Sequence, residues 1–368
     1  MKKIEKYIVF EESETFLRKV DFNINNKDFI LEVINSQKIK SIEELNKQNI
    51  KADKIILALK GDKATTVEGS FKIERSTPDS PITESELDNL VFKGLWEFLN
   101  KYRTWASNKM GISDLDMTLY GIEVADILID SHNVIDPVGI KGKNFYIKIK
   151  GTFIPRDVLS YVSEFNFFGK TLEVIEKNST TSSLLSDREG FVLNCGTEKT
   201  ELFSIKNNNV SFKKSFDWGL DLLINEVSKL LKTNKQDSKS ILNRYFNKRV
   251  SSKLKRRIDK SIKPHFKKIN DIIKSISLSK KEKIYINIQK NIFENNLKKK
   301  KSLNHINFKE ILELKELNVI INLKEEDEIN LNSDYLALVG CYIFYSPHYD
   351  NLNKILNRRS KWLVPNKK

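Results

Sequence analysis

The chain of 368 residues has little of what holds small cross-linked or metal-bound proteins together. Its two cysteines, Cys195 and Cys341, are too few for a disulfide framework and fit a reducing compartment. Its four histidines lack metal-ligand spacing, so we predict no metal site and no zinc-type catalysis. No apolar run reaches the ~18 residues that span a bilayer, and the lysines after Met1 predict no secretory leader. These absences favour a cytoplasmic chain.

The length and composition predict more than one folded domain. A chain of 368 residues exceeds one typical core, and 39% hydrophobic residues suffice for folded domains. The net charge of +15 is unevenly spread, because residues 232–301 hold 23 Lys/Arg against 5 Asp/Glu. This basic block indicates either an anionic partner or a solvated helical face.

The first half of the sequence alternates strands and helices. Residues 54–59 form a short, continuously apolar run, which predicts a buried strand. Thr83 and Glu86 form a capping box before a helix over residues 84–106 with one apolar face. We expect Trp96, Tyr102 and Trp105 to be core residues, with an interface as the alternative. Further predicted elements are strands at 6–10, 16–22, 28–34, 116–122, 126–129, 144–152 and 171–175, and helices at 42–46 and 155–164.

The second half opens with a hairpin at residues 190–202. Apolar residues lead into a turn at Gly196, and a second strand follows through residue 205. The turn has the size that suits a phosphate, with Asn194, Thr197 and Thr200 beside it. The later predicted elements are helices at 219–232, 238–277, 334–344 and 349–364, and strands at 283–288 and 318–323, while residues 308–314 stay ambiguous.

Four motifs occur in the order that one known family has. They are Ile-Thr-x-x-Glu-Leu at 82–87, Val-Ile-Asp-Pro-Val-Gly-Ile-Lys-Gly at 134–142, the hairpin at 190–202, and Tyr-Leu-Ala-Leu-Val-Gly at 335–340. With them the chain resembles the actin-like ATPases, in the branch of the bacterial cell-division protein FtsA and the pilus scaffold PilM. The loop at 134–142 is the most specific match.

The resemblance implies an α/β fold of the actin-like (ribonuclease H-like) type, with two domains and an FtsA/PilM-type α/β insert subdomain. We expect the first domain at residues 1–80 and 169–188, with the insert at 81–168 between them. The second domain is expected at 189–348, including the basic helical block 232–301. A basic amphipathic tail is expected at 349–368.

The family holds ATP and magnesium between its domains, and this sequence departs from the pattern at each of five elements. The first phosphate turn is Glu-Glu-Ser-Glu at 11–14, where glycine is missing and carboxylates would repel phosphate. The second keeps Gly196, Thr197 and Thr200, but Asn194 replaces the acid that helps to hold magnesium. The third keeps only Gly219 before a helix, whose N-terminus could attract an anion.

The last two elements concern the nucleoside. Ser238 and Lys239 stand where a carboxylate should meet the ribose, and residues 289–291 replace a Gly-Gly turn beside adenine. No glycine occurs between Gly219 and Gly340. We therefore predict a pseudo-ATPase without catalytic residues and without a cofactor, rather than an enzyme. The alternative is an ATP-binding, nucleotide-switched filament former, with ATP and magnesium at the remnant site Asn194, Gly196, Thr197, Thr200 and Gly219.

The C-terminal stretch combines apolar and basic residues with a tryptophan. Such a helix suits an anionic membrane surface, and FtsA ends in a similar anchor. The other interpretation is a terminal helix packed on its own domain with its cations in water. The predicted membrane-contacting residues are Leu352, Ile355, Leu356, Arg358, Arg359, Trp362 and Leu363.

The resemblance implies a scaffold at the inner face of the cytoplasmic membrane, in cell division or another envelope machine. It would recruit protein partners and could assemble into filaments. A third hypothesis is a basic nucleic-acid-binding module, because Tyr245 and Phe246 lie within the basic run, although no nucleic-acid motif accompanies them. The sequence does not separate division from pilus or secretion roles.

Overall fold

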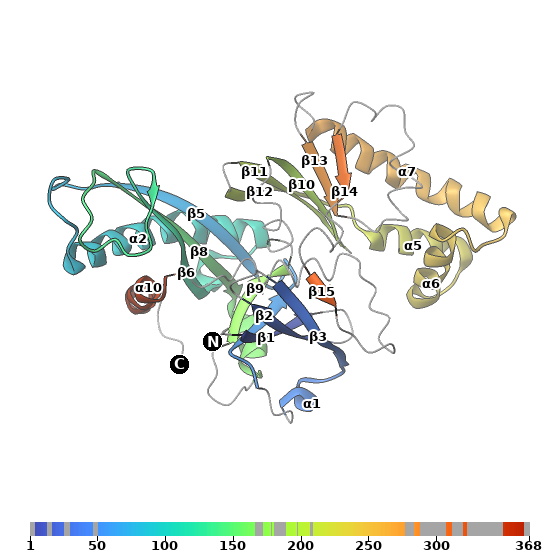
Figure 1. Ribbon diagram of the computed structural model, residues 1–368. Helices are drawn as coiled ribbons and strands as arrows, with labels where there is room; N and C mark the ends of the chain where they lie inside the picture. Colours follow the sequence, from blue (N-terminus) through green and yellow to red (C-terminus); the bar gives the residue numbers. More distant parts are fainter. Residues whose placement is uncertain are drawn as a thin grey trace. The chain divides into compact units, whose positions relative to one another are not determined.

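The computed structural model describes residues 4–12, 17–25, 30–46, 51–165, 172–177, 179, 189–196, 198–206, 209–276, 283–287, 307–310, 319–321 and 349–363. The chain divides into two compact units. Unit 1 comprises residues 1–184, 318–329 and 337–368, and unit 2 comprises residues 185–317 and 330–336. Each unit is built around a mixed β-sheet (Figure 1).

The main sheet of unit 1 has six strands in the order β15-β3-β2-β1-β4-β9. Strands β1, β2 and β3 form an antiparallel meander, whereas β4 is parallel to both β1 and β9. Apolar side chains of β1 and β4 are buried together with helix α3. The bounds are β1 Ile4–Glu12, β2 Leu17–Asn25, β3 Ile30–Ile39, α1 Ile42–Asn46, β4 Lys54–Leu59, α3 Arg156–Ser163, β9 Leu172–Glu176 and β15 Val319–Ile321.

Unit 1 contains a second sheet with its own helix, which is called the insert from here on and includes β5, ahead of the predicted start at residue 81. Its four strands run in the order β5-β8-β6-β7, and helix α2 lies along one side of the long strands (Figure 1). Strand β5 was not predicted, although Gly61 and Asp62 mark a turn before it and its apolar and polar residues alternate. The bounds are β5 Thr65–Glu74, α2 Glu84–Met110, the 3-10 turn η1 Asp114–Asp116, β6 Met117–Ile129, β7 His132–Asn133 and β8 Asn144–Pro155.

Local chemistry fixes both ends of α2. The Thr83 hydroxyl accepts a hydrogen bond from the backbone N–H of Glu86, as predicted for a capping residue. The helix continues four residues beyond the predicted end and stops at Gly111, whose φ of 70° is left-handed. Its buried stripe includes Leu90, Leu95 and Phe98, which pack on the insert sheet.

Strand β6 corrects a second expectation. The sequence suggests two strands broken at residues 123–125, but the structure has one strand with register shifts at Leu119/Gly121 and Val124/Asp126. A β-bulge interrupts the in-and-out alternation without ending the strand. In the sequence, a bulge therefore looks the same as the end of one strand and the start of another.

Unit 2 contains a five-stranded sheet in the order β12-β11-β10-β13-β14. The predicted hairpin is formed by β10 and β11, and a third antiparallel strand, β12, was not predicted. Three helices follow, and their apolar faces share one core with β10 and β13. The bounds are β10 Gly190–Cys195, β11 Thr200–Lys206, β12 Asn209–Phe216, α5 Leu220–Leu231, α6 Lys235–Phe246, α7 Ser252–Ile276, β13 Lys283–Asn287 and β14 Asn307–Glu310.

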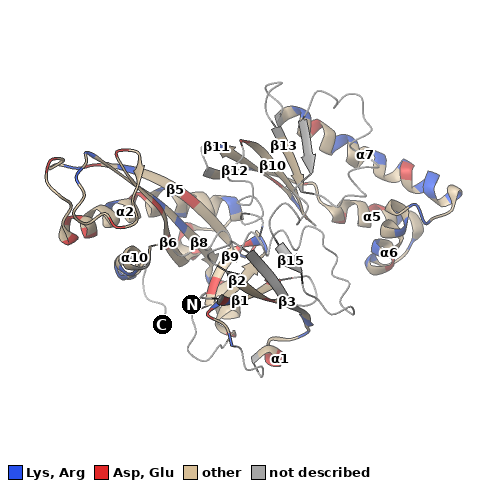
Figure 2. Ribbon diagram, in the orientation of Figure 1, with Lys and Arg blue, Asp and Glu red and all other residues tan. Residues whose placement is uncertain are grey.

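The basic block forms α6 and α7, and α7 is strongly two-sided. Its apolar side buries Ile258, Ile262, Phe266, Ile269 and Ile273 in the unit 2 core. Lysines and arginines follow its other side (Figure 2), and those at 253, 255, 256, 257, 260, 263, 267, 268 and 274 are exposed. Such a helix is stabilised by burial of its apolar stripe, while its cations stay in water.

The last described element is α10, Asp350–Leu363. It belongs to unit 1 and packs on the insert, where Leu352 and Leu356 join the insert core. The predicted helix at 334–344 lies outside the described residues. Within the described part, no helix is long and apolar enough to cross a membrane.

Candidate functional site

In unit 1, the candidate site is the edge where three parallel strands end. Strands β1, β4 and β9 are mutually aligned, so their carboxyl ends meet at one edge of the sheet. Ligands of α/β proteins bind at such edges. Here β1 ends in Glu11 and Glu12, which are both buried, and Ser13 and Glu14 lie outside the described residues.

Cations of the same unit neutralise these two carboxylates. Glu11 pairs with Lys177, just after β9, and lies 3.8 Å from the guanidinium of Arg18. Glu12 pairs with Lys63, just after β4. At this edge the carboxylates are thus paired with lysine and arginine side chains. The described part of the turn contains no glycine whose backbone could approach a phosphate.

A third carboxylate, that of Glu176 at the end of β9, is also buried. It accepts the backbone N–H of Thr66 at 3.1 Å and the hydroxyl of Ser179 at 2.8 Å, and it pairs with Lys109 of α2 at 2.5 Å. Both charged side chains are almost fully buried, which is tolerable only because they pair and are hydrogen-bonded. The cluster joins the insert helix to the main sheet. Sequence reasoning missed it; the only signal was a glutamate ending an apolar strand.

In unit 2, the predicted phosphate turn is closed on itself. The N–H of Gly196 donates to the carbonyl of Lys199 at 2.9 Å, and its own carbonyl accepts the N–H of Leu220 at 3.1 Å. The hydroxyl of Thr200 is buried and donates to the carbonyl of Trp218 at 2.8 Å. The N–H of Gly196 and the hydroxyl of Thr200 therefore bond within the protein, and Thr197 lies outside the described residues.

Gly196 is needed for close approach of the chain to itself. A Cβ at this position would lie 2.9 Å from the Lys199 carbonyl oxygen, closer than real Cβ contacts. The neighbouring Asn194 is buried, and burial raises the pKa of the Cys195 thiol to about 12. The thiol is therefore neutral near pH 7 and a poor nucleophile.

The third predicted element is placed beside the second. Gly219 caps α5 in an extended conformation, and the following Leu220 bonds to Gly196. A helix N-terminus attracts anions, but the first turn of α5 carries Asp221, which opposes this. Gly196, Thr200 and Gly219 thus lie close together, while their role as a phosphate site stays a prediction.

Of the two predicted nucleoside-binding elements, the structure describes only the one at Ser238. Ser238 is buried near the start of α6 and bonds to Thr233 and to the carbonyl of Asn234, so its hydroxyl serves the local fold. Residues 289–291 lie outside the described residues. No cluster of three or more metal-ligating side chains occurs in the part of the chain that is described; the expected lack of a metal stays a prediction.

The tail residues predicted to contact a membrane have another position in the structure. Leu352 and Leu356 are buried in the insert core, Ile355 is half-buried against it, and Arg358 and Arg359 both pair with Asp88 of α2. This is the arrangement of the alternative interpretation, a terminal helix packed on its own domain. In this position Leu352 and Leu356 are not available to lipid. Trp362 and Leu363 end the helix.

The aromatic residues singled out in the sequence differ in burial. Tyr245 and Phe246 are buried, so they offer no surface on which bases could stack. Tyr102 and Trp105 pack against the insert core as predicted, whereas Trp96 is 51% exposed and was predicted wrongly.

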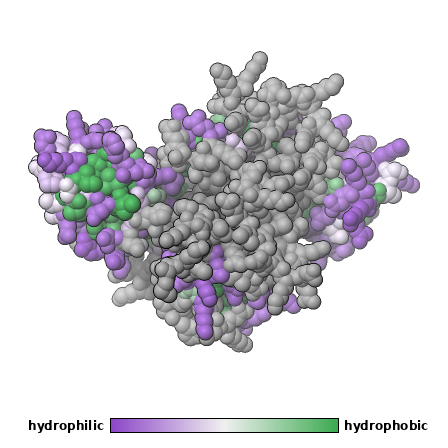
Figure 3. Space-filling model, in the orientation of Figure 1, coloured by the Kyte–Doolittle hydropathy of each residue, from purple (hydrophilic) through white to green (hydrophobic). Residues whose placement is uncertain are grey.

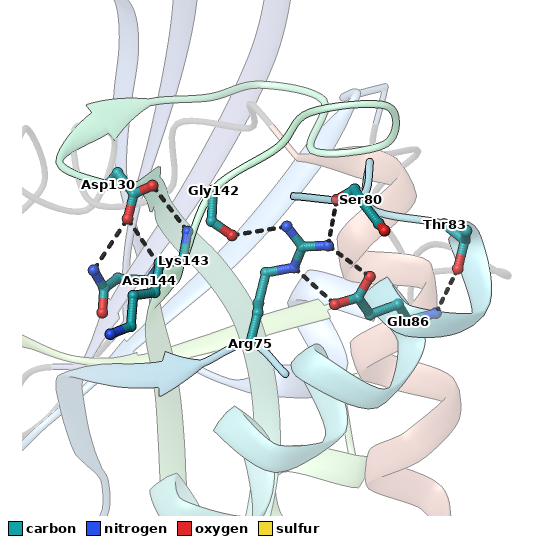
Figure 4. A network of polar contacts seen from close by, with 8 residues as sticks. All are labelled: Arg75, Ser80, Thr83, Glu86, Asp130, Gly142, Lys143 and Asn144. Atoms are coloured by element: carbon teal, nitrogen blue, oxygen red, sulfur yellow. Dashed lines mark hydrogen bonds and ion pairs between the residues drawn. The ribbon is translucent and has the colours of Figure 1, made fainter. Parts of the chain in front are cut away.

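The loop at residues 134–142 is held rigidly on the insert (Figure 4). Arg75, whose side chain is fully buried, donates two hydrogen bonds to Glu86 at 2.7 and 2.8 Å, and others to the carbonyls of Gly142 and Ser80. Asp130 accepts the N–H groups of Lys143 and Asn144.

This fixed loop displays apolar side chains to solvent. Ile135 is 78% exposed and Val138 is 41% exposed. Figure 3 shows hydrophobic side chains gathered on the insert and surrounded by hydrophilic ones. Exposed apolar side chains on a rigid support are typical of interaction sites.

The strand orders, the paired α/β units and the insert define an actin-like fold of two domains, as the sequence predicted. The structure is similar to that of PilM in the PilM–PilN type IV pilus biogenesis complex, with a TM-score of 0.58 and 10% identity. The match covers 94% of this chain and 99% of that one.

Weaker likenesses are found to MreB 5 of Spiroplasma citri bound to AMPPNP, and to the cytoplasmic domain of EpsL from Vibrio cholerae. The first has a TM-score of 0.38 at 9% identity and covers 96% of this chain and 98% of that one. The second has a TM-score of 0.30 at 12% identity and covers 58% and 71%. We base the fold assignment on PilM alone. No family model matches the sequence, and no curated protein does.

Proposed function

We propose that the chain is a PilM-like scaffold that recruits partner proteins in an envelope machine of the pilus or secretion type, without hydrolysing ATP. It would act at the inner face of the cytoplasmic membrane, as a peripheral protein that could assemble into filaments. The FtsA-like role in cell division is the variant of this proposal that the sequence left open. PilM itself is part of a complex with PilN, which supports a role in binding proteins.

The observation that carries the pseudo-ATPase part is the closed turn at Gly196. Phosphate binding at a glycine turn needs free N–H groups directed at the ligand. In this chain the N–H groups of Gly196 and Leu220 and the hydroxyl of Thr200 are bonded to the protein. Opening the turn for ATP would break these bonds, while Asp221 would repel the phosphate.

The nucleotide-switched alternative has one observation in its favour. Gly196, Thr200 and Gly219 still meet as in a phosphate turn. A nucleotide that rearranged this turn could restore binding, so the two functions make opposite predictions for the same measurement.

The deciding experiment is calorimetric titration of the full chain with ATP and magnesium, with a phosphate-release assay beside it. We expect no binding heat at protein concentrations of about 100 μM, which detects dissociation constants into the high micromolar range, and no phosphate release. Micromolar binding would contradict the proposal and favour the nucleotide switch. Asn194→Asp, which returns the carboxylate, is the matched variant; it should not bind either, because the turn stays closed.

A further inference from the structure

Helix α10 is bound to the insert through one side only. Tyr349, Leu352 and Leu356 are buried in the insert core at spacings of three and four residues, which places them on one stripe. Ile355 is half-buried beside them, whereas Asn351, Lys354 and Asn357 are exposed. This is the way an amphipathic helix lies in a groove.

One wall of this groove is the open edge of β6. Before Ile127 this strand pairs only with β8 among the described residues, and the Val124/Asp126 bulge interrupts that pairing. The side chain of Asn353 accepts the N–H of Val124 at 2.7 Å, and the hydroxyl of Tyr349 donates to Asp126 at 3.1 Å. Side chains of α10 thus cover a strand edge that would otherwise be exposed.

The other wall is α2, which supplies a negative charge. Asp88 pairs with Arg358 at 2.6 Å and also with Arg359. The guanidinium of Arg359 lies 5.3 Å from the centre of the Phe92 ring, a cation–π contact. This end of the groove therefore favours a helix with adjacent cations.

We propose that this groove, formed by α2 and the edge of β6, is a docking site for a basic amphipathic helix of a partner protein, with α10 as its occupant in cis. All the contacts just described are made by side chains of α10, so another helix with the same pattern would satisfy them. The pattern is an aromatic residue, two leucines at the third and seventh positions after it, and a pair of arginines following. Because both helices need the same face, a partner helix must displace α10, which makes α10 a built-in competitor.

The test uses the full chain and a fluorescent peptide of residues 349–363. In Leu352→Asp/Leu356→Asp, the release variant, α10 loses its buried stripe while the groove stays intact. Fluorescence anisotropy should show peptide binding to the release variant at least about tenfold tighter than to the wild type. The control Asn351→Asp/Asn357→Asp adds the same charge on the exposed side and should behave like the wild type.

A charge swap identifies the groove as the place of binding. In the release variant, Asp88→Arg should weaken binding of the peptide by about tenfold or more, and a peptide with Arg358→Glu/Arg359→Glu should restore it. Should the release variant not fold, Asp88→Arg alone with the swapped peptide answers the same question, since its leucines are intact.

Four outcomes would overturn the proposal, of which the first three concern the peptide and the protein alone. These three are a folded release variant that binds no peptide, equal binding to the wild type and the release variant, and binding that ignores the charge at position 88. Binding of the peptide to anionic vesicles with none to the folded release variant would equally overturn it, in favour of the membrane.

Discussion

At the residue scale, the structure shows how a few side chains fix the loop at 134–142. Arg75 is the centre, because its fully buried guanidinium bonds to Glu86 and to two carbonyls from separate segments. The planar guanidinium makes a bidentate pair with the carboxylate and still donates to two carbonyls, whereas lysine has only three donors and no planar fork. Capping box and loop are therefore joined by one side chain, although the sequence presents them as separate motifs.

Gly142 is required by packing at this loop. A Cβ there would lie 2.3 Å from a methyl carbon of Ile129 and 2.7 Å from the Asp130 carboxylate. Gly142→Ala should lower the free energy of unfolding by about 1–3 kcal/mol through overpacking. Urea denaturation measures this, with Gly121→Ala as the control, because a Cβ at Gly121 meets nothing within 4 Å. Equal losses in both variants would contradict the explanation.

The Glu86 carboxylate makes the stability of the insert depend on pH, and the direction of this dependence follows from its pKa. Its hydrogen bond to Arg75 lowers the pKa of the Glu86 carboxyl below its ordinary value of 4.5. Its contribution to stability is therefore complete above pH 4.5 and is lost as the pH falls through the lowered folded-state pKa.

The stability difference between the wild type and Glu86→Gln should consequently be large at pH 7 and shrink toward pH 3. Urea midpoints at several pH values measure it. Glu84→Gln, an exposed carboxylate of the same helical turn, is the control and should show a smaller change. A difference that stays constant with pH would argue against the ion pair.

At the element scale, the closed turn at Gly196 connects the β10–β11 hairpin to α5. The bonds from Leu220 to Gly196 and from Thr200 to Trp218 hold the start of α5 against the hairpin. The indole N–H of Trp218 in turn donates to the carbonyl of His265 in α7 at 2.9 Å. A remnant of a phosphate site can thus serve as a structural joint between elements of unit 2.

Thr200→Val tests this joint. The substitution keeps the shape but removes the hydroxyl, which leaves the buried carbonyl of Trp218 without its donor. We expect a loss of about 1–3 kcal/mol in the free energy of unfolding, measured by urea denaturation. The exposed Ser211→Ala should change it by less than about 0.5 kcal/mol. A neutral Thr200→Val would mean that water replaces the bond.

At the scale of the whole molecule, the chain holds separate cores in its two units. The insert core and the core of α5, α6 and α7 share no residue. Units with their own cores often open as separate cooperative units. The positive charge is also concentrated in one unit, because the exposed lysines and arginines of α7 belong to unit 2.

Hydrogen exchange followed by mass spectrometry should report each core on its own. Gly142→Ala should accelerate exchange in peptides from residues 65–155 and leave those from 220–276 unchanged. Thr200→Val should do the reverse. Acceleration of all peptides by either variant would show that the two units unfold as one.

Much of the fold followed from local patterns in the sequence. A continuous apolar run predicted β4, and Thr83 with Glu86 predicted the start of α2, because these signals depend on neighbours within one helical turn or strand. The motif order was enough to predict the actin-like class. Strand β6 was split in the prediction because its bulges interrupt the period of two, whereas β5 alternates regularly and was simply overlooked.

Tertiary structure alone decided how the site and the tail are used. The sequence placed Gly196, Thr200 and Gly219 together, but not the bonds that close their turn, since those depend on where Lys199, Trp218 and Leu220 come to lie. The sequence likewise shows the apolar stripe of α10 but not the surface against which this stripe packs. A stripe is buried against whatever surface complements it, and here that surface, with Val124 and Asp88, comes from more than 200 residues earlier in the chain.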